Sequence, residues 1–361
     1  MSSSFEQPRP NDDAPQHAPR PLPLFLDMLR SETAKDPARR AAALLGLARY
    51  QAARREHGLP PLKEVRRHGR VTLRGTAGEG TPVVLVPSLI NPPAVLDLSE
   101  DRSLLRWLGA QGFAAWLLDW GEPVPAERDL SVTGHVESLL LPLLATFDRP
   151  PVLVGYCLGG TMALAAAARA RVAGAQVAGV ATMAAPWKFE GYGPARDAIA
   201  AMWRGAQPTC EALGLVPMEV LQAGFWQLDP ARTIAKFEAF GRMDPDSAQA
   251  KAFIRLEDWS NAGAPLTYAA GAELFAMIAD DAPGRGMWRV GGDTVDPAAL
   301  GVPAVEFVST TDRIVPAATA AGLPDHRDIA SGHVGMIVGG RARATLWQPL
   351  ADWIAALPSP T

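Results

Sequence analysis

The chain has 361 residues, of which 48% are hydrophobic and 20% are charged, and its net charge is −4 at pH 7. This length is ample for one large α/β domain and a subdomain. Its two cysteines are too few for a disulfide framework, and a reducing cytoplasm suits both. No uninterrupted apolar run approaches the ~20 residues of a membrane span, so a soluble protein with no membrane span is expected.

The N-terminal part of the chain is unlike the rest. Residues 1–20 are polar and proline-rich, lack the apolar stretch of a signal peptide, and are expected to be a disordered tail. Residues 21–68 are expected to form a basic helical segment, with Asp36 as N-cap, Pro37 as first helical residue and Gly58 as stop. The expected apolar stripe of this helix consists of Ala41, Leu44, Leu45 and Ala48.

Residues 1–75 hold 14 basic and 8 acidic residues, so this segment is a basic module in an acidic chain. Its arginines indicate either a solvated helix face packed on the protein body, or a surface for an anionic partner or a coenzyme phosphate. No nucleic-acid-binding motif accompanies them, so no nucleic-acid partner is expected.

From about residue 69 the pattern alternates between strands and helices. The expected strands are 70–73, 82–86, 113–119, 152–156 and 175–183, and the expected helices are 103–111, 130–146 and 161–169. This alternation predicts an α/β fold whose mainly parallel sheet has helices on both faces. The pattern divides this part of the chain into three expected segments. Residues 69–187 form the first part of the core, 188–295 form a helical cap with no convincing strand, and 296–361 form the C-terminal part of the core.

A candidate nucleophile lies in the sequence Gly155-Tyr156-Cys157-Leu158-Gly159. It follows an expected strand and precedes an alanine-rich expected helix, which is the setting of the G-x-S-x-G nucleophile elbow, here with cysteine in place of serine. The N-terminus of the helix favours a thiolate and a developing oxyanion. The alternative is a buried structural cysteine in a glycine turn. Cys210 is expected to be an ordinary free thiol.

Such a nucleophile is followed along the chain by an acid and then by a histidine. Asp312, in the loop after the expected strand 302–309, is the candidate acid, and His333, flanked by glycine before the expected helix 342–356, is the candidate base. Asp119, at the end of an earlier expected strand, is the rival acid. Four of the remaining histidines are expected to be solvated: His17, His57, His68 and His326. His135 is expected to be a surface or packing residue.

Several motifs together resemble the polyhydroxyalkanoate synthases. The cysteine elbow with its additional Gly160 matches the cysteine box of that family, and the resemblance runs from about residue 80 to the C-terminus. The other matching segments are 84–91, 95–98, 103–108, 117–121, 255–259, 312–316 and 331–335.

The resemblance implies an α/β-hydrolase fold with a helical cap insertion. It also implies an acyltransferase of polyhydroxyalkanoate biosynthesis that acts on 3-hydroxyacyl-coenzyme A, with Cys157 as nucleophile, Asp312 as orienting acid and His333 as general base. The chain length is similar to that of the short synthases, which work with a second subunit. A second synthase subunit or a homodimer is therefore an expected partner, and the expected location is the cytoplasm, at polyester storage granules.

Sulfur suits this chemistry, because moving an acyl group from a coenzyme A thioester to a cysteine is nearly balanced in free energy. The expected oxyanion donors are the backbone N–H of Leu158 and one from the loop near Ser88. A cytoplasmic hydrolase with the same triad, either an acyl-coenzyme A thioesterase or a polyester depolymerase, remains an alternative, as does a granule-associated or subunit-binding pseudoenzyme. No cluster of residues has metal-ligand spacing, so no metal or redox cofactor is expected.

Overall fold

The computed structural model describes residues 17–55, 58–60, 62–76 and 78–358. The predictions made for residues 1–16 and for His57 lie outside this part of the chain. The contacts between its residues divide the chain into two compact units. The first combines the described part of Met1–His57 with Asp229–Asn261, and the second combines Gly58–Leu228 with Ala262–Thr361.

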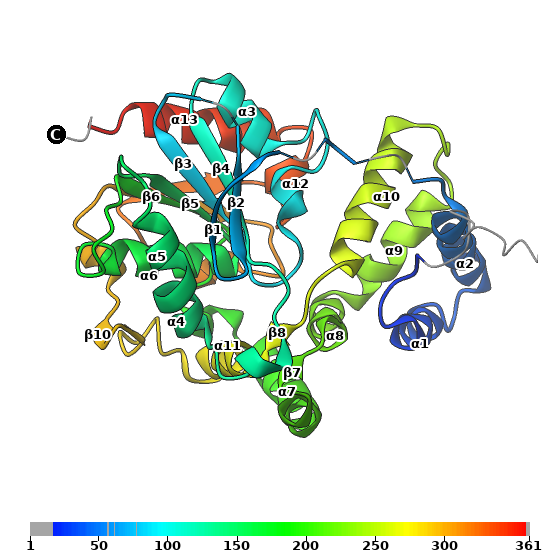
Figure 1. Ribbon diagram of the computed structural model, residues 1–361. Helices are drawn as coiled ribbons and strands as arrows, with labels where there is room; N and C mark the ends of the chain where they lie inside the picture. The colour runs from blue at the N-terminus through cyan, green and yellow to red at the C-terminus, as the bar shows by residue number, and fades with distance from the viewer. Residues whose placement is uncertain (1–16, 56–57, 61, 77, 359–361) are drawn as a thin grey trace, which may run out of the picture. The chain divides into compact units, whose positions relative to one another are not determined.

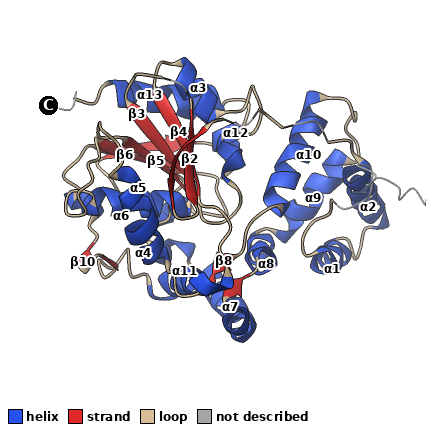
Figure 2. Cartoon of the chain, viewed as in Figure 1, coloured by secondary structure: helices blue, strands red, loops and turns tan. Residues whose placement is uncertain are grey.

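The second unit is built on an eight-stranded sheet with the order β1-β2-β4-β3-β5-β6-β11-β12 (Figures 1 and 2). The pairs β1/β2 and β2/β4 are antiparallel, and all the others are parallel. The strands are β1 Glu64–His68, β2 Val71–Gly75, β3 Pro82–Val86, β4 Ala114–Asp119, β5 Val152–Tyr156, β6 Gly179–Met183, β11 Ala304–Ser309 and β12 Asp325–Ile329. The central strands β3, β5 and β6 are buried at every position, as expected for parallel strands covered on both faces.

Helices cover both faces of this sheet (Figure 1). The α-helices of the second unit are α3 Leu104–Ala110, α4 Val132–His135, α5 Leu141–Leu144, α6 Leu158–Arg169, α7 Ala195–Leu213, α8 Met218–Leu228, α11 Tyr268–Asp280, α12 Gly335–Val338 and α13 Gln348–Ala355. Two π-helical segments, η3 Val136–Leu140 and η7 Arg343–Trp347, adjoin these helices. The short 3-10 helices are η1 Pro93–Leu96, η2 Pro125–Glu127, η4 Phe189–Tyr192, η5 Pro297–Ala299 and η6 Ala317–Thr319. The rings of Trp107 in α3 and Trp347 in η7 pack with their centroids 5.7 Å apart, which joins the helices on one face. The predicted α/β fold with a mainly parallel sheet is confirmed.

The main differences from the predicted elements concern short strands. The strand β1 was missed, because Arg66, Arg67 and His68 are polar and the strand exists only through its pairing with β2. The prediction of a strand-free segment 188–295 was wrong. Two short antiparallel pairs lie within it, each only two residues long per strand: β7 Leu215–Val216 with β8 Leu266–Thr267, and β9 Arg289–Val290 with β10 Asp293–Thr294.

The described residues of the first unit form four helices: α1 Leu22–Glu32, α2 Pro37–Ala52, α9 Pro230–Phe240 and α10 Ala248–Asn261. It therefore joins the N-terminal segment to helices from the middle of the chain, while α7, α8 and α11 belong to the second unit. The side chain of Asp36 accepts the Arg39 N–H at 3.0 Å, which confirms this residue as N-cap of α2. The helix ends at Ala52 and not at Gly58, because the backbone turns extended at Ala53.

The apolar stripe predicted for α2 is not its buried face. Leu44 and Leu45 are 44% and 48% exposed, while Gly46 and Leu47 are buried. The reason lies in Gly46, where a Cβ atom would lie 1.9 Å from the carbonyl oxygen of Phe237 in α9. The absence of a side chain at this position lets the two helices approach closely, and this selects the face that packs.

The arginines of α2 have partners inside the first unit. Arg39 binds Glu238 of α9 at 2.7 Å, and Arg55, just after α2, binds Asp258 of α10 at 2.9 Å. The same Asp258 accepts the Tyr50 hydroxyl at 2.6 Å. These contacts agree with a helix that packs on its own unit. A cavity of about 670 Å³ in this unit is lined by Arg49, Ala52, Ala53, Arg54, Arg55, Phe240, Met243, Pro245, Asp246, Lys251 and Ile254.

Among the helices of the described residues, none is both sufficiently long and sufficiently apolar to cross a membrane.

Candidate active site

Cys157 lies in a strained turn between β5 and α6. Its backbone has φ 54° and ψ −133°, a conformation that non-glycine residues rarely adopt. Its N–H donates to the Met183 carbonyl at 3.0 Å, and its carbonyl accepts the Gly160 N–H at 2.8 Å. These bonds hold the residue in the turn of a nucleophile elbow, at the carboxyl end of a central strand.

Two glycines of the motif let the backbone segments around Cys157 approach closely. A Cβ at Gly155 would lie 2.4 Å from the Cα of Gly160, and a Cβ at Gly159 would lie 2.2 Å from the carbonyl oxygen of Val86. Both neighbours are backbone atoms, which cannot move aside as a flexible side chain can. The G-x-C-x-G spacing is therefore required by the contacts among β5, α6 and the end of β3.

His333 and Asp312 form a buried pair. His333 lies between β12 and α12, Asp312 follows β11, and the His333 Nδ1 lies 2.6 Å from the Asp312 Oδ2. The other oxygen, Oδ1, accepts the N–H groups of Ile314 at 2.8 Å and Val315 at 3.0 Å. Asp312 is thus held by its own loop, with one oxygen left for the imidazole. The fold brings these two residues together although they are 21 positions apart in the chain.

The charge environment of His333 favours the imidazolium. Burial lowers the pKa of His333, but the charges of Asp312 and Cys157 and the hydrogen bonds to both side chains outweigh it and raise this pKa to about 10. The side chains of Cys157, His333 and Asp312 therefore interact as one electrostatic group. A histidine that interacts with a cysteine side chain in this way is the arrangement found where histidine activates a cysteine nucleophile.

Asp119, the rival acid, makes a local contact. Its Oδ1 accepts the Gly121 N–H at 3.0 Å, at the carboxyl end of β4. Of the two candidate carboxylates, Asp312 is the one in contact with His333.

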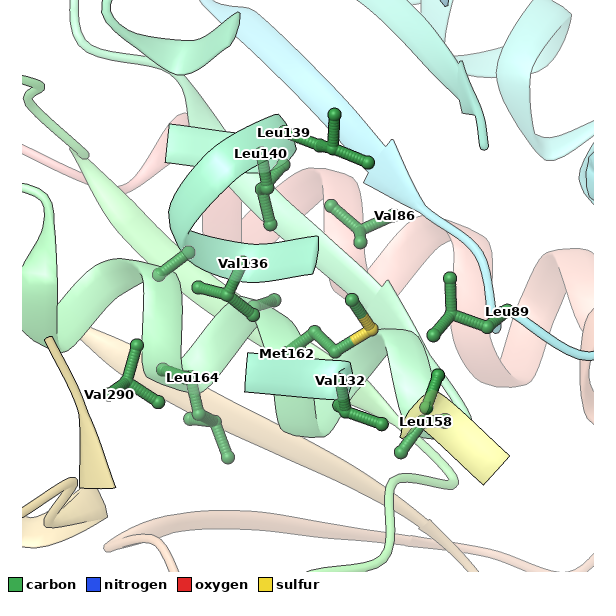
Figure 3. Close-up of a cluster of buried hydrophobic side chains, with 14 of the residues drawn as sticks. Val86, Leu89, Val132, Val136, Leu139, Leu140, Leu158, Met162, Leu164 and Val290 are labelled. Atoms are coloured by element: carbon green, nitrogen blue, oxygen red, sulfur yellow. The ribbon is translucent and has the colours of Figure 1, made fainter. Parts of the chain in front are cut away.

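The two predicted oxyanion donors lie on segments that meet at the elbow. Leu158 is the first residue of α6, so its N–H has no acceptor within the helix. Ser88 follows β3, the strand paired with β5, and its Oγ accepts the Ile90 N–H at 3.1 Å. Figure 3 shows Leu158 and Leu89 in one buried cluster with Met162 of α6.

Trp120 holds the loop that carries Ser88 in place through a hydrogen bond to its backbone. The Trp120 Nε1 donates to the Pro87 carbonyl at 3.0 Å. Its ring and the His135 ring pack in a T-shaped arrangement, with centroids 5.8 Å apart and an interplanar angle of 80°. His135 is buried, and this burial lowers its pKa to about 4, so it is neutral and serves as the packing residue that the sequence allowed. Its Nε2 lies 2.6 Å from the guanidinium of Arg70.

Two tyrosines of the site were missed by sequence reasoning. The Tyr156 ring stacks on the His333 ring with centroids 4.9 Å apart. Tyr192, in η4, lies within the electrostatic influence of Cys157 and Asp312, since burial and then these two charges raise its pKa well above 10. The place of Tyr156 beside Cys157 was a usable signal. Nothing in the sequence marked Tyr192, which lies 35 positions beyond Cys157.

The other cysteine and the remaining described histidines lie apart from these contacts. Cys210 is a buried free thiol in α7. His326 is not simply solvated, because its two ring nitrogens contact Glu306 at 2.7 Å and Asp328 at 3.0 Å. His68 is exposed, and His17 lies 3.6 Å from Asp258.

No protein-family model matches the chain. Curated relatives do. The poly(3-hydroxyalkanoate) polymerase subunit PhaC of Haloferax mediterranei is 28% identical over 298 residues, which cover 76% of this chain and 58% of that protein. The subunit of the same name from Allochromatium vinosum is 26% identical over 294 residues, which cover 76% of this chain and 80% of that protein. The subunit from Synechocystis is 27% identical over 297 residues, which cover 76% and 77%.

The chain spans about three fifths of the length of the relatives from Haloferax mediterranei and Haloarcula marismortui, with 58% and 61% covered. Among solved structures, the monoacylglycerol lipase of Paleococcus ferrophilus has a TM-score of 0.50 at 15% identity, over 79% of this chain and 98% of that one. This likeness concerns the fold, which is that of the α/β hydrolases. The chain is thus similar in sequence to the poly(3-hydroxyalkanoate) polymerase subunits, and its fold is that of the α/β hydrolases.

Proposed function

We propose that this protein is an acyltransferase that uses Cys157 as nucleophile on 3-hydroxyacyl-coenzyme A, as a polyhydroxyalkanoate synthase or a close relative. The observation that carries the proposal is a cysteine in a strained elbow whose side chain interacts with the buried His333–Asp312 pair, in a homologue of polyester polymerases. An ordinary structural cysteine has no need of an imidazolium partner.

In the first half-reaction the Cys157 thiolate attacks the carbonyl carbon of the thioester, and a new C–S bond forms. The negative charge develops on the former carbonyl oxygen, where the N–H of Leu158 and one from the Ser88 loop would receive it. Collapse of this intermediate breaks the bond to the coenzyme A sulfur, which leaves with the proton of the His333 imidazolium. One thioester replaces another, so the acyl group stays activated.

In the second half-reaction the hydroxyl of another hydroxyacyl group or of a growing chain attacks the acyl-cysteine. His333, now neutral, takes the hydroxyl proton while the C–O bond forms, and Cys157 leaves as thiolate. Asp312 holds the Nδ1 edge of the imidazole, so the other nitrogen is the one available for the transferred proton. The thiolate and the imidazolium are thereby restored.

We further propose that a second synthase subunit or a second copy of this chain completes the active enzyme, and that it acts in the cytoplasm at polyester granules. The names of the relatives, which are subunits of a polymerase, support the proposal of a partner. The proposed reaction supports the location at granules, because a polymer that exceeds its solubility collects where it is made.

The test is to incubate the wild-type protein and Cys157→Ala with 3-hydroxybutyryl-coenzyme A, following free thiol release and the fate of the acyl group in the same tubes. Cys157-dependent release together with oligomer or polymer is the expected result. Release with free 3-hydroxybutyrate alone would favour the hydrolase with the same triad. No release above the Cys157→Ala level, even with an added second synthase subunit, would overturn the acyltransferase proposal.

A further inference from the structure

Tyr156 is the last residue of β5 and is 3% exposed. Its ring lies against the imidazole of His333 with an interplanar angle of 29° and a centroid distance of 4.9 Å. Its hydroxyl donates to the His333 carbonyl oxygen at 3.3 Å. One side chain thus contacts both the ring and the backbone of the candidate base, from a position next to the candidate nucleophile.

These contacts complement the one made by Asp312. The bond at Nδ1 holds one edge of the imidazole but leaves the ring able to tilt about that contact. A stacked ring of similar size restricts the tilt, and the hydroxyl bond holds the backbone from which the ring projects. Three points of support define the direction in which the other nitrogen points.

The stacked face also suits a charged imidazole. An aromatic ring presents negative potential on its face, which attracts a cation placed over it. His333 is buried, so water cannot supply this stabilisation. The phenol itself stays protonated, because burial and then the charges of Cys157 and Asp312 raise the pKa of Tyr156 well above 10, and a protonated hydroxyl is what the bond to the carbonyl needs.

We propose that Tyr156 is a positioning residue for His333: its ring and hydroxyl keep the imidazole in the plane that serves Cys157 and stabilise the imidazolium of the imidazolium–thiolate pair. This inference rests on the proposed function for its relevance to turnover. The state of the thiol, however, can be measured without any acyl substrate.

The experiment is the rate of Cys157 alkylation by iodoacetamide as a function of pH, read by peptide mass spectrometry so that Cys210 is counted separately. Tyr156→Phe keeps the stacking and loses only the hydroxyl bond. Tyr156→Leu loses both. The matched control is Tyr268→Phe in α11, where the lost contact is a hydrogen bond from Gln207 at 3.2 Å.

The midpoint of the alkylation profile is expected to rise by about one pH unit in Tyr156→Leu, so that alkylation below the midpoint slows about tenfold. Tyr156→Phe should shift it less, and Tyr268→Phe should not shift it. With 3-hydroxybutyryl-coenzyme A, kcat should fall in the order wild type, Tyr156→Phe, Tyr156→Leu, with little change in KM. A merely structural tyrosine would lower stability without moving the alkylation midpoint.

A pentafluorophenyl ring at position 156 provides the decisive comparison if Tyr156→Leu does not fold. It has nearly the shape of the ring in Tyr156→Phe but the opposite charge distribution on its face, so the midpoint should rise relative to Tyr156→Phe. Equal midpoints for these two proteins would overturn the stabilisation of the imidazolium by the ring. If alkylation behaves as expected but Cys157→Ala still turns over substrate, the proposed function fails while the role of Tyr156 stands.

Discussion

The Asp312 Oδ2 lies 2.6 Å from the His333 Nδ1, while the Asp312 Oδ1 is held by two backbone N–H groups of its own loop. The carboxylate therefore reaches the imidazole without freedom to turn away. Replacement of the Asp312 carboxylate should therefore disturb the orientation and charge of His333 more than the rest of the site.

Asp312→Asn should lower kcat for coenzyme A release by about 10³ to 10⁴, because an amide can neither enforce the required imidazole tautomer nor balance the imidazolium charge. Steady-state kinetics with 3-hydroxybutyryl-coenzyme A measure this. Asp119→Asn is the matched control, since the Asp119 carboxylate accepts a local hydrogen bond from the Gly121 N–H. A larger loss in Asp119→Asn than in Asp312→Asn would reassign the acid.

His333 should make stability depend on pH. In the folded protein its pKa is raised to about 10, since Asp312 and Cys157 outweigh the effect of burial, whereas in the unfolded chain it is about 6.5. Because the folded value is the higher one, the stabilisation is fully present below about pH 6.5 and is lost as the pH rises through about 10.

Urea denaturation of the wild type and of His333→Gln at a series of pH values measures this effect. The advantage of the wild type in free energy of unfolding should shrink as the pH rises from about 6.5 to about 10. An advantage that stayed constant over this range would show that His333 gains no proton affinity on folding.

Gly159→Ala should destabilise the protein by about 1–3 kcal/mol, because the added Cβ would lie 2.2 Å from the Val86 carbonyl oxygen and 2.4 Å from that of Pro87. Thermal or urea unfolding measures the cost. Gly205→Ala is the control, since a Cβ at this exposed position in α7 meets nothing within 4 Å. It should be stabilising by about 0.5–1 kcal/mol.

Trp120→Phe should reduce kcat more than it changes KM. It removes the 3.0 Å bond from the indole to the buried Pro87 carbonyl and so loosens the loop that carries Ser88. An unsatisfied buried carbonyl costs about 1–3 kcal/mol, so unfolding experiments should also detect a loss. Unchanged kcat in a destabilised variant would separate Trp120 from the chemistry and leave it a structural residue only.

Local patterns in the sequence determined much of this protein. The alternation of apolar runs predicted β3 and β5 at their observed bounds, because strands buried on both faces must be apolar throughout. The cysteine elbow was predictable because its turn requires small residues at fixed positions around Cys157. The meeting of Asp312 and His333 was predictable as well, since both follow strands that end at the same edge of a parallel sheet.

Only the tertiary structure decided the features that depend on contacts between distant segments. The apolar stripe of Leu44 and Leu45 predicted one buried face for α2, but the close approach of α9 at Gly46 selected another. The strand β1 exists because β2 offers it a partner. Tyr156 lies 177 positions from His333, and no local pattern indicates that their rings stack. The apolar periodicity of the sequence indicates which residues are buried. The segment that packs against them is determined by the packing of the whole chain.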